Sequence, residues 1–217
     1  MGHTLSESDS KAVLAPFGVP FAPEEQVDNP RDAAAAAERL GFPVALKLCG
    51  DQIAHKTERG LVRLGLRGRD AVEEAATELL AAARPDDGEV ALLVAPMVSG
   101  SRELIAGMSR DPQFGPTVMV GVGGVLTEAL DDAVVRLVPL SPLDASEMIG
   151  DLRSQALLAS VRGEPPVDRD ALVSILLALS AAAEAHPEIE SIDLNPLIVS
   201  GGRPVAVDAL VEIGDPR

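Results

Sequence analysis

The stretch GFPVALKLCG (residues 41–50) decides how the first half of the chain is interpreted, because it joins a helix end to an apolar strand. Gly41 closes an alanine-rich helical run at residues 31–40, and residues 44–48 form the strand. Lys47 interrupts that strand, where a lysine is costly to bury unless its ammonium group meets an anion. Lys47 is therefore either a solvent-facing residue of an edge strand or a lysine that binds phosphate.

The elements predicted around this strand describe an α+β fold. A helix at residues 6–15 comes first. After residues 44–48 the first half continues with a polar loop, a strand, an amphipathic helix and another strand, at residues 50–60, 61–66, 70–83 and 90–97. The second half repeats this style, with strands at residues 103–109, 117–122 and 134–137, helices at 141–152 and 169–185, and final strands at 189–199 and 204–211.

Composition and charge exclude several function classes. The formal net charge of −16 disfavours nucleic acid and anionic membranes as partners, because cations that neutralise phosphate dominate such binding. A phosphate ligand held by a few local cations and backbone N–H groups remains compatible with this charge. The single Cys49 allows no internal disulfide, and the sequence shows neither a signal-peptide pattern nor an apolar run of membrane-spanning length. We therefore expect a cytoplasmic location.

The polar loop CGDQIAHKTERGLV directly follows the Lys47 strand and carries His55, Lys56 and Gly60. Such a loop can cover phosphates with N–H groups and a cation. Imidazole can also accept and pass on a phosphoryl group. The alternative for His55 is a solvated loop residue, which is the commoner fate of an isolated loop histidine.

Near the C-terminus, Asn195 and Asp208 interrupt two apolar strand patterns on either side of the turn SGGR. If the strands pair around that turn, an amide oxygen and a carboxylate could face one cleft. Hard oxygen ligands of this kind suit Mg²⁺, which keeps several waters and takes substrate phosphates. The alternative is a turn at Asn195 and an exposed strand end at Asp208.

A glycine-rich run, GVGG at residues 121–124, follows a predicted strand. Glycine permits close approach of the backbone to a ligand, although a tight transition from strand to turn explains the run equally well. The chain contains neither GxGxxG nor GxxxxGK[ST], so a Rossmann dinucleotide site and a P-loop are both unsupported.

Taken in order, these pieces resemble the ATP-grasp domain of NDP-forming acyl-CoA synthetases, close to the ATP-grasp part of succinyl-CoA synthetase β subunits. The resemblance covers nearly the whole chain, through LSESDSKAVLAPFGVP, ERLGFPVALKL, IAHKTERGLVRLGL, VAPMVSGSRELIAGMSRDPQFGP, GVGGV, VRLVPLSP, IDLNPLIV and AVDAL. It implies one ATP-grasp domain at residues 1–217, with two α+β lobes that hold ATP or ADP in a cleft between them. The phosphate-loop lobe would span residues 20–95, and the Mg²⁺-binding lobe residues 96–217 together with helix 6–16.

The resemblance also implies roles for individual residues. Three would be catalytic: His55 as a phosphoryl relay, Lys56 in the phosphate-covering loop, and Asp193 as the acid that faces the phosphohistidine of a partner subunit. Asn195 and Asp208 would be the Mg²⁺ ligands. The residues implied in nucleotide binding are a phosphate-contacting lysine, a loop glycine, a hinge whose backbone reads adenine and a cleft glutamate: Lys47, Gly60, Ala95, Pro96, Met97, Val98 and Glu103.

The loop departs from the family pattern in two places. Family loops often read HK-S/T-D-x-G-G-V, whereas this chain has Glu58 in place of the aspartate and Leu61 in place of the second glycine. We expect the end of the loop to be stiffer as a result, which bears on the relay by His55 more than on nucleotide binding.

The implied reaction is acyl-CoA + ADP + phosphate giving acid + CoA + ATP, through an acyl phosphate and a phosphohistidine. The acyl-CoA site and that histidine belong to a CoA-binding α subunit, which 217 residues cannot also accommodate, so an αβ or α₂β₂ assembly is implied. Two rival functions remain: a non-catalytic ATP-binding sensor or regulatory protein, and a stand-alone ATP-grasp carboxylate–amine ligase, for whose acceptor site no segment is left over. A purely structural α+β domain leaves Lys47, Asn195 and Asp208 without a reason.

Overall fold

The chain forms two compact units, which are described separately. The computed structural model describes residues 3–50, 53, 56, 59–124 and 131–214. The smaller unit consists of residues 4–9 and 22–97, and the larger unit of residues 1–3, 10–21 and 98–217. Each unit combines one β-sheet with helices, which confirms the α+β class.

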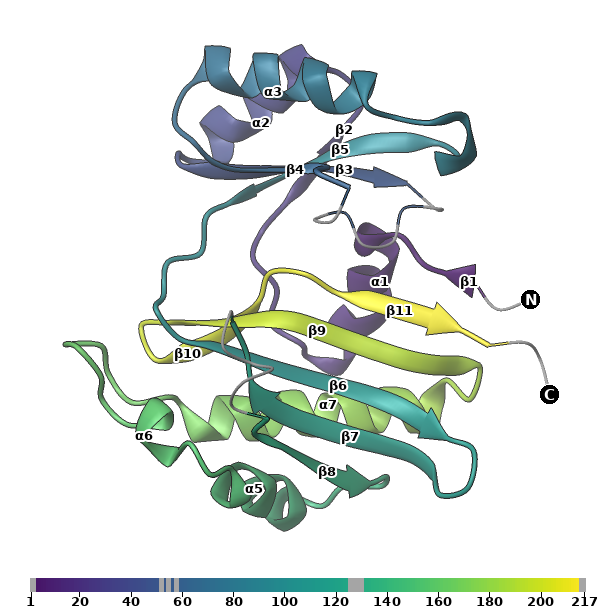
Figure 1. Ribbon diagram of the computed structural model, residues 1–217, viewed down its shortest axis with the longest axis vertical. Helices are drawn as coiled ribbons and strands as arrows, with labels where there is room; N and C mark the ends of the chain where they lie inside the picture. The colour runs from purple at the N-terminus through teal and green to yellow at the C-terminus, as the bar shows by residue number, and fades with distance from the viewer. Residues whose placement is uncertain (1–2, 51–52, 54–55, 57–58, 125–130, 215–217) are drawn as a thin grey trace. The chain divides into compact units, whose positions relative to one another are not determined.

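The smaller unit is built on a four-stranded antiparallel sheet with the strand order β2-β5-β3-β4. Its strands are β2 (Glu25–Val27), β5 (Val90–Pro96), β3 (Val44–Gly50) and β4 (Val62–Leu66). Helices α2 (Pro30–Leu40) and α3 (Arg69–Ala81) lie together on one face of the sheet, and the short η2 (Pro85–Asp87) follows α3 (Figure 1).

Small side chains set the packing of the smaller unit. Helix α2 begins at Asn29, whose side chain accepts a hydrogen bond from the Asp32 N–H at 3.0 Å, and it ends at Gly41 with φ +89°. The buried face of α2 consists of four alanines, which allow close approach of α2 to α3 and β5. These alanines share one core cluster with aliphatic residues of β3 and β5: Val44, Leu46, Leu48, Leu92 and Val94.

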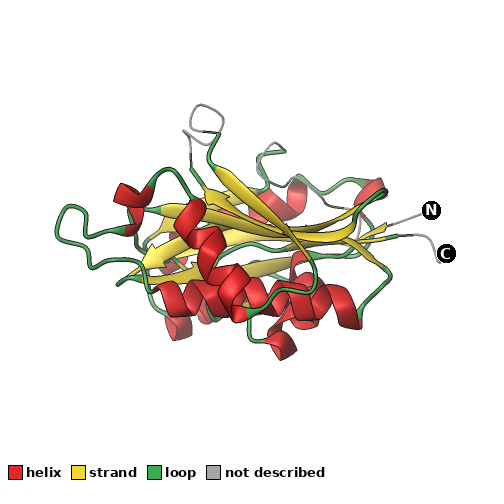
Figure 2. Ribbon diagram, turned by 90° about the horizontal axis from the view of Figure 1, so that it is seen from below, coloured by secondary structure: helices red, strands yellow, loops and turns green. Residues whose placement is uncertain are grey.

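The larger unit contains a seven-stranded sheet with the order β1-β11-β9-β6-β7-β8, in which β10 also pairs with β9. The strands are β1 (His3–Thr4), β6 (Glu103–Asp111), β7 (Gly115–Val122), β8 (Ala133–Leu137), β9 (Ile189–Ser200), β10 (Arg203–Ala206) and β11 (Leu210–Ile213). The helical elements are η1 (Ala15–Phe17), α5 (Pro142–Asp151), α6 (Gln155–Leu158), α7 (Arg169–Ala185) and, from Ser10 onward, α1 (Glu7–Leu14), whose first turn belongs to the smaller unit. Helices α5 and α7 cover one face of this sheet in Figure 1, and Figure 2 colours the same elements by type.

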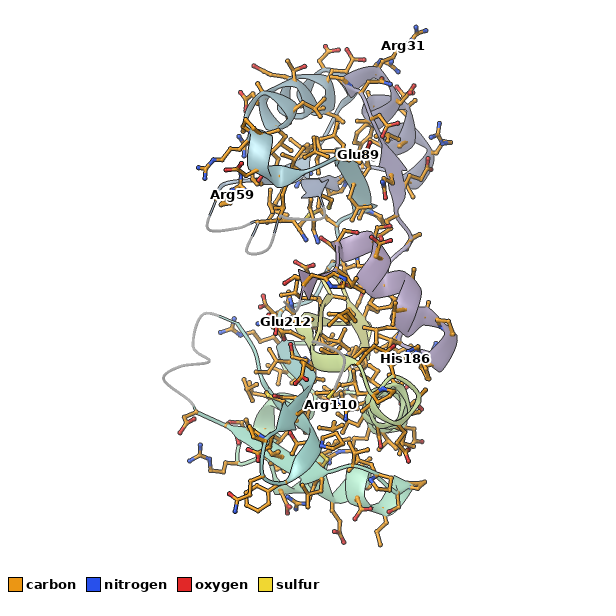
Figure 3. All side chains as sticks on the ribbon, turned by 90° about the vertical axis from the view of Figure 1, so that its right-hand side faces the viewer. Arg31, Arg59, Glu89, Arg110, His186 and Glu212 are labelled. Atoms are coloured by element: carbon orange, nitrogen blue, oxygen red, sulfur yellow. The ribbon has the colours of Figure 1, made fainter. Side chains whose placement is uncertain are left out.

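Strand β6 is the centre of the larger unit because it pairs with both β7 and β9. Its residues Leu104, Ala106 and Met108 are buried toward the helices. At its far end Arg110 donates hydrogen bonds to the carbonyls of Ala183 at 2.7 Å and His186 at 3.0 Å (Figure 3). A guanidinium group there satisfies carbonyls that the end of α7 leaves unpaired.

The predicted strand at residues 204–211 is the clearest error in the element assignment, because it is two strands, β10 and β11. The break lies opposite Pro196, which has no N–H to contribute to the ladder; only the Val207 N–H reaches the Pro196 carbonyl, at 3.3 Å. The short elements β1 and α6 were not predicted from the sequence. None of the helices that the structure describes combines the length and apolarity needed to cross a membrane.

Candidate functional site

Lys47 is an interior residue of the smaller unit. All seven residues of β3 are buried, and β3 lies between β5 and β4, so the edge-strand interpretation is wrong. Lys47 pairs in register with Leu93 and Val62 and is 8% exposed. Its Nζ lies 2.6 Å from Oε1 of Glu7, in the first turn of α1, so the ammonium group has the anion that its burial requires.

Lys56 shares that anion. Its Nζ lies 2.7 Å from Oε2 of Glu7, and both lysine side chains and the carboxylate are almost completely buried. Each carboxylate oxygen of Glu7 therefore accepts a charge-assisted hydrogen bond from a different lysine. Two of the predicted phosphate-contacting residues, Lys47 and Lys56, are thus brought to one carboxylate.

The end of the predicted phosphate loop is anchored to the rest of the smaller unit. Gly60 has φ +67°, a conformation that favours glycine, and the Leu61 N–H donates to the Lys56 carbonyl at 2.9 Å. Arg59 (labelled in Figure 3) forms a two-pronged ion pair with Asp87, at 2.6 and 2.9 Å. The hydrogen bond from Arg59 is the largest cause that lowers the pKa of Asp87, to about 2. His55 and Glu58 lie outside the described residues.

Residues 95–98 straddle the division between the units, which falls between Met97 and Val98. Ala95 and Pro96 end β5, and the Met97 N–H donates to the Pro43 carbonyl at 2.9 Å. Adenine recognition by this backbone stays a prediction.

Asn195 lies in β9, and Asp208 lies in the segment between β10 and β11, the two strands that pair with β9 in the C-terminal hairpin of the larger unit. The β9–β10 register pairs Ala206 with Leu197, and the β9–β11 register pairs Leu210 with Asp193. Both registers continue one another, so Asp208 stands opposite Asn195. Directly opposed residues of an antiparallel pair project from the same face. The expected pairing of the strands around SGGR is confirmed. That Asn195 and Asp208 bind one metal ion stays a prediction.

The exposed face of the sheet changes sides at this point. In β9, Ile192 and Leu194 are buried before Asn195, whereas Leu197 and Val199 are buried after it. The β6–β9 register shifts between Leu104 and Ala106, so β9 carries a bulge there. Asp193 and Asn195 are both exposed, and their side chains are hydrogen-bonded to each other.

Asp193 and Glu103 complete the set of predicted residues in the larger unit. Burial raises the pKa of the Asp193 carboxyl, and a hydrogen bond with the Asn195 side chain acts in the opposite direction. Neighbouring protein atoms partly shield the Asp193 carboxyl group from water, although the residue as a whole is exposed. Glu103 is exposed at the first position of β6, and its carbonyl accepts a hydrogen bond from the Gly123 N–H at 2.8 Å.

The glycine-rich run serves the sheet itself. A Cβ on Gly123 would lie 3.1 Å from backbone atoms of Glu103 and Leu104. The interpretation as a tight transition from strand to turn therefore accounts for Gly123 in the described residues. Residues 125–130 lie outside them.

Sequence reasoning missed the three polar residues of α1 that hold other parts of the chain. Glu7 binds the two lysines described above. In the larger unit, Ser10 Oγ accepts a hydrogen bond from the Val211 N–H at 3.1 Å, and Lys11 Nζ reaches the Val207 carbonyl at 3.5 Å. These two contacts flank Asp208 on both sides. In the sequence, an acidic first turn followed by lysine is indistinguishable from ordinary helix-end charge placement.

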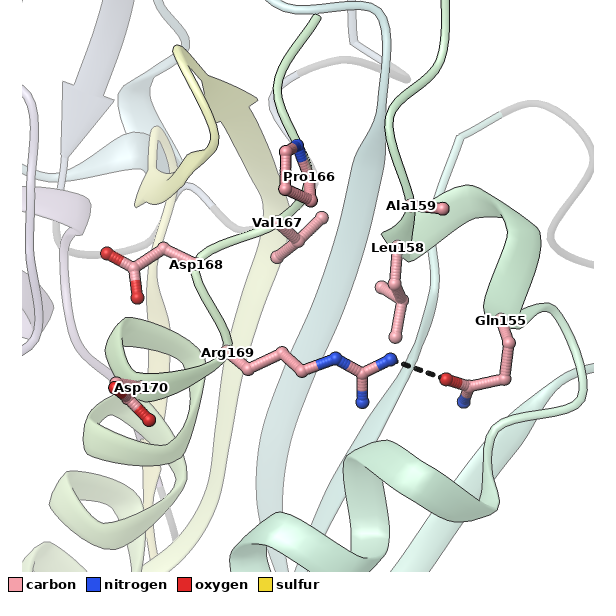
Figure 4. A pocket seen from close by; sticks show the side chains of 8 residues that line it. All are labelled: Gln155, Leu158, Ala159, Pro166, Val167, Asp168, Arg169 and Asp170. Atoms are coloured by element: carbon pink, nitrogen blue, oxygen red, sulfur yellow. Dashed lines mark hydrogen bonds between the residues drawn. The ribbon is translucent and has the colours of Figure 1, made fainter.

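The donor set of the hairpin fits a magnesium ion. An amide oxygen and a carboxylate are hard ligands, and two protein ligands leave room for water and phosphate. Within the described residues no group of three or more His, Cys, Asp and Glu side chains is placed to hold a metal by itself. A separate pocket between α6 and the start of α7, spanned by the 2.6 Å hydrogen bond from Arg169 to Gln155, contains none of the predicted site residues (Figure 4).

Known protein families and curated sequences match this chain over most of its length. Residues 1–213 match the ATP-grasp domain family. The β subunit of acetate–CoA ligase [ADP-forming] I from Pyrococcus furiosus is 36% identical over 208 residues, covering 94% of this chain and 90% of the relative. Acetate–CoA ligase [ADP-forming] I from Archaeoglobus fulgidus is 37% identical over 217 residues, and this chain spans 32% of its length.

Solved structures give the same result. The dinucleotide-forming acetyl-coenzyme A synthetase 1 of Ca. Korarchaeum cryptofilum, in complex with coenzyme A, Ca-AMPCP and HgCl⁺, superposes with a TM-score of 0.90 at 34% identity. The match covers 97% of this chain and 93% of that chain. A structure of the same synthetase with coenzyme A and Mg-AMPPCP has its phosphohistidine segment pointing towards the nucleotide binding site. It gives a TM-score of 0.82 at 34% identity, with the same coverage of both chains.

Proposed function

The chain belongs to the ATP-grasp family, among the β subunits of ADP-forming acyl-CoA ligases, and from this premise we propose how its residues divide the work of the reaction. It binds ATP or ADP with Mg²⁺ and moves a phosphoryl group between the nucleotide and a histidine of a CoA-binding α subunit. The net reaction is acyl-CoA + ADP + phosphate giving acid + CoA + ATP. The assembly is αβ or α₂β₂ and cytoplasmic, without nucleic acid or membrane partners.

The observation that carries the proposal is the register of β9 with β10 and β11, which is the same on both sides of the break and therefore sets Asp208 opposite Asn195. Both side chains can coordinate a metal ion through oxygen. Asn195 lies at the position in β9 where the exposed face of the strand changes sides. When bound, Mg²⁺ neutralises phosphate charge and fixes the orientation of the phosphate oxygens. The neighbouring structure with Mg-AMPPCP supports the choice of metal.

Lys47 and Lys56 supply the positive charge around the transferred phosphoryl group. Phosphoryl transfer needs little covalent chemistry from the protein, and it depends on positioning and on positive charge around the transferred group. Two lysines on one carboxylate in the smaller unit provide that charge in a water-poor setting. The Ala95–Val98 backbone contacts adenine, Gly60 shapes the phosphate loop, and Glu103 contacts the nucleotide from the larger unit.

The partner's histidine is the phosphoryl acceptor when ATP is consumed. The bond from the γ-phosphorus to the bridging oxygen breaks as a P–N bond to the imidazole forms, and ADP leaves. Asp193, whose raised pKa reflects its crowded surroundings, faces the incoming imidazole ring. His55 relays the phosphoryl group between this site and the acyl-CoA site.

Calorimetric titration tests the nucleotide-binding half of the proposal. Wild type is titrated with Mg-ATP and Mg-ADP beside Lys47→Ala, and beside Arg39→Ala as a control that removes an exposed cation paired with Glu25 in the same unit. We expect binding by wild type and Arg39→Ala and its loss in Lys47→Ala. No binding by wild type rejects both the ligase and the ATP-sensor function.

Mixing with the CoA-binding subunit and γ-labelled ATP then separates the two. Acid-labile, base-stable label on the partner histidine supports the ligase, and nucleotide binding without such label supports the sensor. Transfer without any partner, onto an added amine and carboxylate, would instead point to the stand-alone carboxylate–amine ligase. Full transfer in His55→Ala would remove the relay role only.

A further inference from the structure

Lysine is used selectively in this chain. The sequence contains three lysines, Lys11, Lys47 and Lys56, within a total of 18 lysines and arginines. Each of the three is buried, with 6%, 8% and 7% of its surface exposed. Lysine is normally among the most exposed residue types. A compact ammonium group with rotatable donors has therefore been placed only at interior positions, two of which meet at Glu7.

Glu7 is the residue that brings Lys47 and Lys56 together. Lys47 comes from the centre of β3 and Lys56 from the loop after it, nine positions further along the chain. Their Nζ atoms lie 2.6 and 2.7 Å from separate oxygens of a carboxylate whose side chain has no exposed surface. The Glu7 carboxylate offsets the repulsion between the two buried ammonium groups.

Stability alone is a weak reason for such an arrangement. Taking three charged groups out of water costs several kcal/mol per ion, and well-packed apolar residues of similar volume are often as stable or more so. A chain that packs the smaller unit with aliphatic side chains could have filled this position with leucine. An ionic cluster is explained when the cations serve a ligand, because their positions then have to be set before the ligand arrives.

We propose that Glu7 is a positioning residue for nucleotide phosphate, which orients the ammonium groups of Lys47 and Lys56 without contacting the nucleotide itself. This inference rests on the proposed function. It assigns a role to the N-terminal helix, which supplies Glu7 to the smaller unit and, through Ser10 and Lys11, holds the segment that carries Asp208 in the larger unit. The affinity gained from phosphate then depends on Glu7, and the affinity gained from adenine does not.

The test compares Mg-ATP with adenosine. Affinities of the full chain for both ligands are measured by calorimetry and NMR titration for wild type, Glu7→Gln and Glu7→Asp, with folding checked by circular dichroism. Asp9→Asn is the matched control, since it removes an exposed carboxylate from the same first helical turn. We expect Glu7→Gln to weaken Mg-ATP binding roughly tenfold to a hundredfold, the worth of one or two hydrogen bonds between charged groups. Adenosine affinity should stay within about twofold.

The outcomes are distinguishable. A wild type that binds Mg-ATP no better than adenosine defeats the proposed function itself. If wild type prefers Mg-ATP and Glu7→Gln keeps that preference, Glu7 does not position the lysines, although the function stands. Equal losses for both ligands indicate a structural role, and tighter Mg-ATP binding indicates that Glu7 competes with phosphate; either result overturns the proposal. If Glu7→Gln does not fold, Glu7→Asp carries the test, because it keeps the charge and shortens the reach, and an unchanged preference there overturns it as well.

Discussion

Replacing Arg102 with methionine should be one of the most destabilising single changes in the larger unit. Arg102 is 5% exposed and directly precedes β6. Its guanidinium group donates to the carbonyls of Leu157, Ala159 and Pro165 at 3.3, 2.9 and 2.5 Å, and its Nε lies 3.3 Å from Glu164. One side chain therefore ties the loop around residues 157–165 to the start of the central strand.

The magnitude follows from those four bonds. A hydrogen bond from a charged donor contributes about 1.5–3 kcal/mol, so simple addition would give roughly 6–12 kcal/mol. The true cost is smaller because Ala159 and Pro165 are exposed residues whose carbonyls can turn to water. Methionine fills much of the same volume, which limits the packing loss. We expect Arg102→Met to lower the free energy of unfolding by about 3–5 kcal/mol.

Urea unfolding measures this change. The chain has no Trp and no Tyr, so the transition is followed by circular dichroism rather than by fluorescence. Arg102→Lys keeps the charge but cannot span four acceptors with one ammonium group, and it should lose most of the same free energy. Arg203→Met is the control: that side chain is 79% exposed, and its loss should cost no more than about 0.5 kcal/mol. A change below about 1 kcal/mol for Arg102→Met would refute the reasoning and show that water replaces the guanidinium group.

Three further predictions address single features of the two units. Carboxyl ¹³C NMR should give Asp87 a pKa of about 2, and in Arg59→Met this pKa should move back toward 3.8. Because folding lowers this pKa, wild type should be more stable than Asp87→Asn above pH 3.8, and this advantage should disappear as the pH falls through about 2. Gly107→Ala should cost about 1–3 kcal/mol in urea unfolding, since its Cβ would lie 2.7 Å from the Ile192 carbonyl oxygen, whereas Gly150→Ala, with nothing within 4 Å in helix α5, should gain up to about 1 kcal/mol. Asp208→Asn should remove most of the Mg²⁺ dependence of ATP affinity in calorimetry, and an undiminished Mg²⁺ effect would place the metal elsewhere.

The candidate site was partly visible in the sequence. Lys47 stood out because a charge interrupts an apolar strand, and Asn195 and Asp208 stood out for the same reason. Glu7 did not, because an acidic residue in the first turn of a helix is what the helix dipole favours at any exposed N-terminus. Its burial depends on segments that lie 40 and 49 residues away along the chain, which no local pattern reports.

What the sequence by itself determined is the order and type of the elements, because caps, glycines and periodicity act within a few residues. Asn29 and Gly41 delimit α2, and the apolar residues on both sides of Lys47 indicate the strand β3. Only the tertiary structure decided that β3 is central, that Glu7 holds two lysines and that Asp208 stands opposite Asn195. Those facts depend on strand neighbours and register, which arise when distant segments pair and exclude water together.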